Sequence, residues 1–100
     1  MKKPLDGVKV LDLTRYLPGP FATQLLADFG AEIIKIEEPG GELGRFLPPF
    51  MNGLGTRFCS VNRNKKSITI DLKSDKGKEI FKSMVILFLF LLTEQNQKKY

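Results

Sequence analysis

The sequence predicts an α/β fold, built as a partial βαβ unit with parallel strands. Two short apolar runs, partly β-branched, occupy residues 8–13 and 33–36 and are typical of strands. Residues 21–29 between them carry apolar side chains at helical spacing. Strand, helix and strand within about thirty residues predict a right-handed crossover between parallel strands.

The first two elements have clear boundaries in the sequence. Gly7 and the Pro18-Gly19-Pro20 turn enclose the first strand, whose apolar character predicts that it is buried. Pro20 suits the first turn of the helix, and Gly30 suits a left-handed stop after it. We expect the apolar face of this helix to contain Phe21, Leu25 and Phe29, with Ala22 and Leu26 beside them.

The rest of the chain alternates between irregular and regular patterns. In residues 39–60 the apolar side chains follow neither the two-residue period of a strand nor the 3.6-residue period of a helix, and Gly and Pro are frequent. This predicts a long connection with a functional role. At residues 67–72 apolar and polar side chains alternate, which predicts a strand there. Ser74 or Asp75 then caps a predicted helix that contains Gly77, Ile80 and Met84.

Composition limits the chemistry of the chain. One hundred residues allow a single small domain. The absence of His excludes Ser-His-Asp and Cys-His arrangements and any His-ligated metal site within this chain. Cys59, the single cysteine, forms no intrachain disulfide, and the amino terminus does not resemble a targeting signal. We therefore expect a cytoplasmic protein with no metal site.

Residues 84–92 are nine consecutive apolar residues followed by a polar end. Nine is well below the roughly 20 residues that a membrane-spanning helix needs, so we expect no membrane span. We expect this apolar run to belong to a hydrophobic core whose packing partners are missing. When exposed, it should promote aggregation. The predicted organisation is an incomplete amino-terminal domain at residues 1–85 and a tail at residues 86–100.

The net charge of +5 comes from the second half of the chain. Residues 51–100 contain ten basic and four acidic side chains. This basic character fits either a solvated face or a phosphate-rich ligand, while nucleic acid is disfavoured because few aromatic residues accompany it. The best candidates for phosphate contact are Arg63, Lys65, Lys66 and Lys73, which flank the predicted strand at 67–72.

The first strand-to-helix turn, residues 14–20, is a second candidate, because ligands of open parallel sheets bind beyond the carboxyl ends of the strands. The turn lacks the G-x-G-x-x-G of dinucleotide-binding proteins. Glu37 follows the second strand as the ribose-binding acidic residue of those proteins does, but without the glycines the match to their pattern is weak. A rigid connector without a ligand is the alternative for the turn.

Several ordered blocks resemble a known family. They are residues 8–14 (Val-Lys-Val-Leu-Asp-Leu-Thr), 19–23 (Gly-Pro-Phe-Ala-Thr), 26–37 (Leu-Ala-Asp-Phe-Gly-Ala-Glu-Ile-Ile-Lys-Ile-Glu), 39–41 (Pro-Gly-Gly) and 62–73 (Asn-Arg-Asn-Lys-Lys-Ser-Ile-Thr-Ile-Asp-Leu-Lys). Together they resemble the amino terminus of the family III CoA-transferases of the CaiB/BaiF type. That family includes formyl-CoA, carnitine and succinate/glutarate-type CoA-transferases and α-methylacyl-CoA racemase. The likeness runs from about Leu5 to Lys82 and covers roughly the first fifth of such an enzyme.

The resemblance implies a Rossmann-like large domain that binds coenzyme A, in two subunits that interlock like linked rings. It places the backbone of Tyr16, Leu17 and Pro18 against CoA, and Ile70, Asp71, Leu72 and Lys73 along its adenosine-phosphate end. The family often has a basic residue where this chain has Glu38, whose charge would repel phosphate. Arg45 matches a recurrent arginine after the Pro-Gly-Gly turn.

The resemblance also implies a reaction in which CoA moves between carboxylic acids. In the transferases an aspartate well downstream attacks an acyl-CoA, releases the CoA thiolate and forms a mixed anhydride. The thiolate then displaces the acid to give an aspartyl-type CoA thioester, which passes CoA to the acceptor acid. We expect no catalytic residue in this chain, no permanently bound cofactor, acyl-CoA and a carboxylic acid as substrates, and weak CoA binding by the chain alone. A racemase-type fragment and a noncatalytic nucleotide-binding or interaction module are the alternatives.

Overall fold

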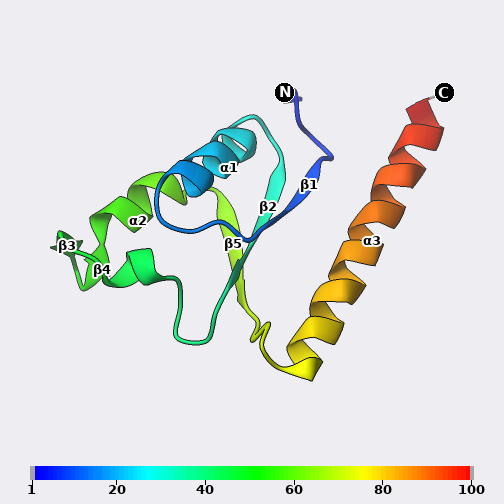
Figure 1. Ribbon diagram of the computed structural model, residues 1–100. Coiled ribbons are helices and arrows are strands. Elements are labelled where there is room, and N and C mark those ends of the chain that lie inside the picture. Colours follow the sequence, from blue (N-terminus) through cyan, green and yellow to red (C-terminus); the bar gives the residue numbers. More distant parts are fainter. Residues whose placement is uncertain (1, 100) are drawn as a thin grey trace.

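The computed structural model describes residues 2–99 of the chain, with side chains described as far as Phe88. Its centre is a three-stranded parallel sheet in the order β1-β2-β5. The strands are β1 (Lys9–Asp12), β2 (Glu32–Glu37) and β5 (Lys65–Thr69). Helices α1 (Pro18–Asp28) and α2 (Thr56–Val61) lie on one side of the sheet, and α3 (Asp75–Lys99) lies on the other (Figure 1). The predicted α/β class with parallel strands is confirmed.

Strand β1 forms and pairs with β2 as predicted, with Val10 opposite Ile33. The prediction that it is buried is confirmed only in part. Asp12 is buried and Val10 and Leu11 are half-buried, whereas Lys9 is exposed, and among the described residues β1 has a neighbour on one edge only. An edge strand buries fewer side chains than a central one, and an apolar run does not distinguish the two positions.

Strand β5 begins and ends earlier than the alternation at residues 67–72 predicts. Its register is set by β2, with Ile36 opposite Ile68 and Glu37 opposite Thr69. Because β2 ends at Glu37, the ladder ends there too, and a last hydrogen bond runs from Ile70 N to Glu37 O at 2.9 Å. The residues after Thr69 are therefore free to turn away from the sheet toward α3.

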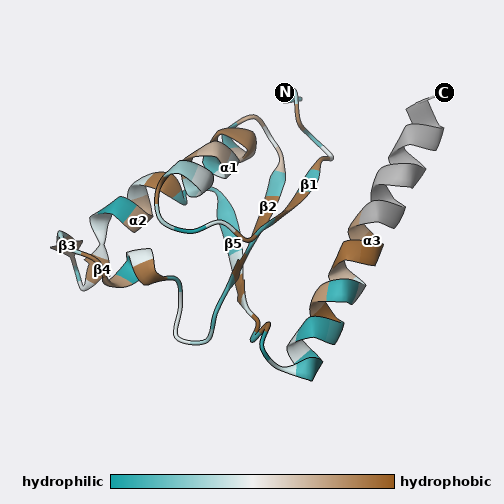
Figure 2. Ribbon diagram, viewed as in Figure 1, coloured by the Kyte–Doolittle hydropathy of each residue, from teal (hydrophilic) through white to brown (hydrophobic). Residues whose placement is uncertain are grey.

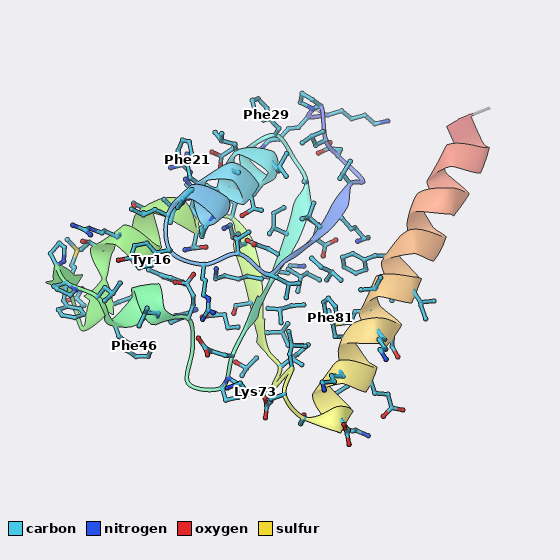
Figure 3. All side chains as sticks on the ribbon, viewed as in Figure 1. Tyr16, Phe21, Phe29, Phe46, Lys73 and Phe81 are labelled. Atoms are coloured by element: carbon cyan, nitrogen blue, oxygen red, sulfur yellow. The ribbon has the colours of Figure 1, made fainter. Side chains whose placement is uncertain are left out.

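Helix α1 starts and stops where Pro20 and Gly30 predict. Gly30 has φ +108, a conformation that favours glycine. The apolar face that the spacing predicts does not pack on the sheet: Phe21 is 52%, Leu25 41% and Phe29 53% exposed. Figure 3 shows Phe21 and Phe29 pointing away from the sheet. The side chains that α1 buries are smaller or polar, namely Pro20, Gln24 and Ala27.

The segment at residues 39–60 is more regular than its sequence indicates. It contains a 3₁₀ turn, η1 (Leu43–Phe46), a short antiparallel hairpin of β3 (Phe50–Met51) and β4 (Leu54–Gly55), and then α2. Each element spans six residues or fewer, which is too short for a period of 2 or 3.6 to be recognised. The prediction of a long irregular connection is therefore corrected to a compact series of turns.

Helix α3 is capped by Ser74, one of the two predicted caps, whose Oγ accepts a hydrogen bond from Gly77 N at 2.9 Å. The helix continues without a break through residues 85 and 86, where we expected a domain boundary. Figure 3 shows Phe81 between α3 and the sheet. Of the apolar run at residues 84–92, Ile86 and Leu87 are exposed, while the side chains from residue 89 onward lie outside the described residues.

The core lies between α1 and the sheet. Ala27, Ala31 and Ile33 form its buried centre, with Leu5, Val8 and Val10 packed against it. Figure 2 shows hydrophobic residues along β1, β2 and α1, and hydrophilic ones in the first turns of α3. In the part of the chain that the structure describes, no helix combines the length and the apolar character needed to cross a bilayer.

Candidate functional site

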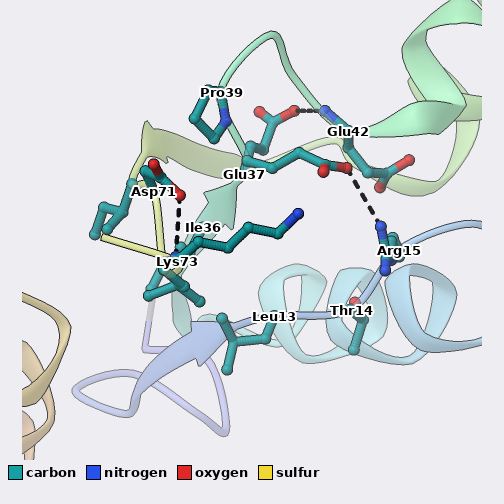
Figure 4. A pocket seen from close by; sticks show the side chains of 12 residues that line it. Leu13, Thr14, Arg15, Ile36, Glu37, Pro39, Glu42, Asp71 and Lys73 are labelled. Carbon is teal, nitrogen blue, oxygen red and sulfur yellow. Dashed lines mark hydrogen bonds and ion pairs between the residues drawn. The ribbon is translucent and has the colours of Figure 1, made fainter. Parts of the chain in front are cut away.

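An open cleft of about 600 Å³ lies at the carboxyl ends of the three parallel strands (Figure 4). Ligands of open parallel sheets bind at this edge. Three loops form the walls: the turn from β1 to α1, the loop from β2 to η1, and the loop from β5 to α3. The lining residues are Leu13, Thr14, Arg15, Ile36, Glu37, Glu38, Pro39, Glu42, Ile70, Asp71, Leu72 and Lys73.

Asp12, the last residue of β1, anchors the turn from β1 to α1. Its carboxylate accepts hydrogen bonds from Thr14 N at 2.9 Å, from the Thr14 hydroxyl, and from Thr23 Oγ1 at 2.7 Å, and it pairs with Lys65 Nζ at 3.0 Å. Burial by itself raises the pKa of Asp12, but these hydrogen bonds outweigh it, so that the pKa lies below its ordinary value. The turn is therefore tied to β1, to α1 and to β5 through one charged group.

Gly19 packs directly against this turn. A Cβ at residue 19 would lie 2.5 Å from Thr14 Cβ, so only glycine allows α1 to start this close to β1. Tyr16 adopts φ 80, which is uncommon for a residue with a side chain. Tyr16, Leu17 and Pro18 follow Arg15 but are not among the residues that line the cleft.

Glu37, at the end of β2, is saturated with donors inside the chain. Arg45 holds both carboxylate oxygens at 2.7 Å, Glu42 N donates at 2.8 Å, and the Ser67 hydroxyl donates as well. The Arg45 guanidinium is the main reason that the pKa of Glu37 falls to about 2. A carboxylate with four internal donors has no free position for a ribose hydroxyl, so the weak analogy with dinucleotide-binding proteins is rejected.

Lys35 is a buried lysine that the sequence analysis missed. It lies within β2 and is 1% exposed. Its Nζ lies 3.0 Å from Thr14 O in one wall of the cleft and 2.8 Å from Glu42 Oε1 in another. The available signal was the lysine in the middle of the apolar run Ile33, Ile34, Lys35, Ile36, because a charged residue inside a central strand needs a partner.

The loop from β5 to α3 contributes four predicted residues to the cleft. Ile70 is buried, Asp71 Oδ1 accepts a hydrogen bond from Lys73 N at 3.0 Å, and Leu72 is partly exposed. Figure 4 shows the Lys73 side chain extending into the middle of the cleft. Its ammonium makes no hydrogen bond or ion pair with any side chain that the structure describes.

Glu38 and Arg15 face each other at the mouth of the cleft. Arg15 Nη1 lies 3.3 Å from Glu38 Oε1, and both side chains are largely exposed. Arg15 belongs to the turn at residues 14–20 that the sequence offers as a candidate, although the family resemblance assigns it no contact. The predicted residues that the structure brings together in the cleft are thus Glu38, Ile70, Asp71, Leu72 and Lys73.

The other three basic candidates lie away from the cleft. Lys65 is buried, and burial lowers its pKa although Asp12 opposes this. Arg63 pairs with Asp28 at 2.7 Å, and Lys66 pairs with Glu32 at 3.3 Å, near the amino-terminal end of β2. Of the four residues selected from charge, only Lys73 lines the cleft. Within the described part of the chain, no group of three or more Asp, Glu or Cys residues is placed to hold a metal ion.

The fold is an α/β segment with an open cleft at the carboxyl edge of a parallel sheet. Residues 5–86 match the model of CoA-transferase family III, and the chain belongs to this family. The chain is 52% identical over 87 residues to succinyl-CoA:glutarate CoA-transferase of Mus musculus, covering 85% of this chain and 20% of the relative.

Two further relatives give the same result. The chain is 49% identical over 86 residues to succinyl-CoA:mesaconate CoA-transferase of Haloarcula hispanica, covering 81% of this chain and 22% of that protein. The crystal structure of a CaiB/BaiF family protein from Brucella suis superposes with a TM-score of 0.75 at 40% identity, over 81% of this chain and 23% of the other. The chain therefore spans about a fifth of the length of the relatives that it matches.

Proposed function

We propose that this chain is the CoA-binding amino-terminal segment of a family III CoA-transferase and that its cleft takes the adenosine-phosphate end of coenzyme A. The observation that carries the proposal is the position of Lys73. Its ammonium extends into a cleft at the carboxyl edge of the sheet, and the chain belongs to a CoA-transferase family. A lysine ammonium without an internal partner is a suitable group for phosphate.

The charges of the cleft do not exclude an anionic ligand. Three of its four carboxylates are paired, Glu37 with Arg45, Glu42 with Lys35, and Glu38 with Arg15. The fourth, Asp71, forms no ion pair among the described side chains, so the positive charge of Lys73 offsets it. Ile36, Ile70 and Leu72 supply apolar surface for a nucleobase.

We propose that the segment binds and orients CoA without catalysing transfer by itself. The family resemblance implies that the attacking aspartate lies well downstream of these residues, so the transfer of CoA from an acyl-CoA to a carboxylic acid would require groups outside the described cleft. The relatives are named for CoA transfer between succinate and a second acid. We extend the proposal to acyl-CoA and carboxylic acid substrates, an interlocked homodimer for the longer protein, residues 1–85 as the CoA-binding part, and a cytoplasmic location.

The role of Lys73 is tested by comparing two lysine substitutions. We expect Lys73→Gln to weaken the binding of adenosine bisphosphate by about tenfold, because one charge-assisted hydrogen bond contributes about 1.5 kcal/mol. Unphosphorylated adenosine should bind both proteins equally. Lys66→Gln is the matched control, because Lys66 pairs with Glu32 away from the cleft. An equal loss in the two variants, or no loss in Lys73→Gln, would reject the assignment.

A further inference from the structure

We propose that Lys35 is a positioning residue that fixes the two main walls of the cleft relative to each other. It lies beneath the cleft in the central strand β2 and does not line it. Its role in ligand binding rests on the function proposed above. Its role in joining the walls stands on the geometry alone.

The ammonium of Lys35 contacts two separate loops. It donates a hydrogen bond to Thr14 O at 3.0 Å, in the turn from β1 to α1, and it pairs with Glu42 Oε1 at 2.8 Å, in the loop from β2 to η1. Thr14 and Glu42 both line the cleft, and Figure 4 shows them on opposite sides of it. One buried cation thus joins two segments that are 28 residues apart in sequence.

The surroundings of Lys35 explain why this link is specific. The Glu42 side chain is also buried, and in the described part of the chain its Oε1 has no polar partner other than the Lys35 ammonium, which therefore neutralises it. Its Oε2 accepts from Gly44 N at 2.7 Å and caps η1. The Phe58 ring lies 5.8 Å from Lys35 Nζ and limits access from the side of α2.

An apolar residue would fill this position without the cost of burying two charges. Replacing a buried ion pair by well-packed uncharged groups is often neutral for stability, whereas removing one partner is strongly destabilising. Stability alone therefore does not require Lys35 and Glu42. What an apolar pair would not provide is a fixed distance between Thr14 O and the Glu42 side chain.

The test uses the double variant Lys35→Met/Glu42→Gln, which removes both charges and keeps an acceptor for Gly44 N. We expect urea unfolding close to that of the unchanged chain. We also expect amide hydrogen exchange at both Thr14 and Glu42 to accelerate by at least about threefold, because the two loops lose their common anchor. The matched control is Lys66→Met/Glu32→Gln, which removes an exposed pair and should change neither amide.

Glu42→Gln alone provides a second variant that tests the same claim if the double variant does not fold. We expect it to shift the amide resonance of Arg15 in the opposite wall, because the connection between them passes through Lys35. Unchanged exchange at either amide in the double variant, or an unchanged Arg15 resonance in Glu42→Gln, would overturn the proposal.

Ligand binding supplies a third measurement. At a fixed concentration of adenosine bisphosphate, the shift of the Lys73 amide should fall by at least about threefold in the double variant. A full shift there would overturn the positioning role. If the unchanged chain itself shows no shift with this ligand, the proposed function fails, while the exchange measurements still decide whether Lys35 joins the walls.

Discussion

The guanidinium of Arg45 holds the carboxylate of Glu37 through two parallel contacts, Nε to Oε1 and Nη2 to Oε2, each of 2.7 Å. The Glu37 side chain is 3% exposed and that of Arg45 is 30% exposed. Arg45 also lies over the Phe58 ring, 4.2 Å from its centre. The pair therefore connects the end of β2 to η1 and α2 and determines the path of one wall of the cleft.

Removing the Arg45 side of this pair leaves a buried carboxylate without its main donor. We expect Arg45→Met to lower the free energy of unfolding by about 2 kcal/mol, less than a fully buried pair would lose because Arg45 is partly exposed. Urea unfolding at neutral pH measures this. Arg63→Met is the control, because the Arg63–Asp28 pair is exposed, and it should leave the unfolding free energy nearly unchanged. Equal effects of the two substitutions would contradict the assigned importance of Glu37–Arg45.

The same pair predicts how stability depends on pH. Hydrogen bonding to Arg45 lowers the pKa of Glu37 from 4.5 to about 2 in the folded chain. A carboxyl whose folded pKa lies below its unfolded pKa adds stability above the unfolded value and loses it as pH falls. We therefore expect the free energy of unfolding to decline between about pH 4.5 and pH 2. Glu37→Gln should flatten this decline, and an equally steep decline in that variant would assign the effect to other carboxyls.

Gly19 provides a test of the turn from β1 to α1. In Gly19→Ala the new Cβ meets Thr14 Cβ at 2.5 Å, so the turn must move. We expect a loss of about 2 kcal/mol in stability and altered amide resonances from Thr14 to Arg15. Gly53→Ala is the control: its φ is +79 and no atom lies within 4 Å of the new Cβ, so backbone strain is its only cost. If the resonances of the turn are unaltered in Gly19→Ala, the close contact with Thr14 does not fix the turn, and the prediction is wrong.

Local sequence signals predicted those parts of the fold that depend on local structure. Pro20 and Gly30 marked the ends of α1, Ser74 marked the start of α3, and β-branched runs marked β1 and β2. The side of α1 that packs against the sheet could not be predicted from local signals. The helix has large apolar residues on one side and small ones on another, and close packing over β2 selects the small side, with Ala27 against Ala31 and Ile33.

In the candidate site, too, local sequence predicted some residues, while contacts between distant segments could not be predicted. Lys73 and its neighbours were predicted because they follow a strand, and the carboxyl ends of parallel strands meet at one edge. Charge alone misassigned Lys65, which pairs with Asp12, because a basic residue in sequence gives no information on its partner. The bond between Lys35 and Thr14 O was not predictable, because it joins a side chain to a backbone atom 21 residues away.

The most direct test of the central claim is a titration of the labelled chain with coenzyme A, followed through its amide resonances. We predict weak binding, with shifts concentrated at Glu38 and residues 70–73 around the cleft and little change near Arg63 and Lys66. Shifts centred on Arg63 and Lys66, or no shifts at all with the chain folded, would contradict the account.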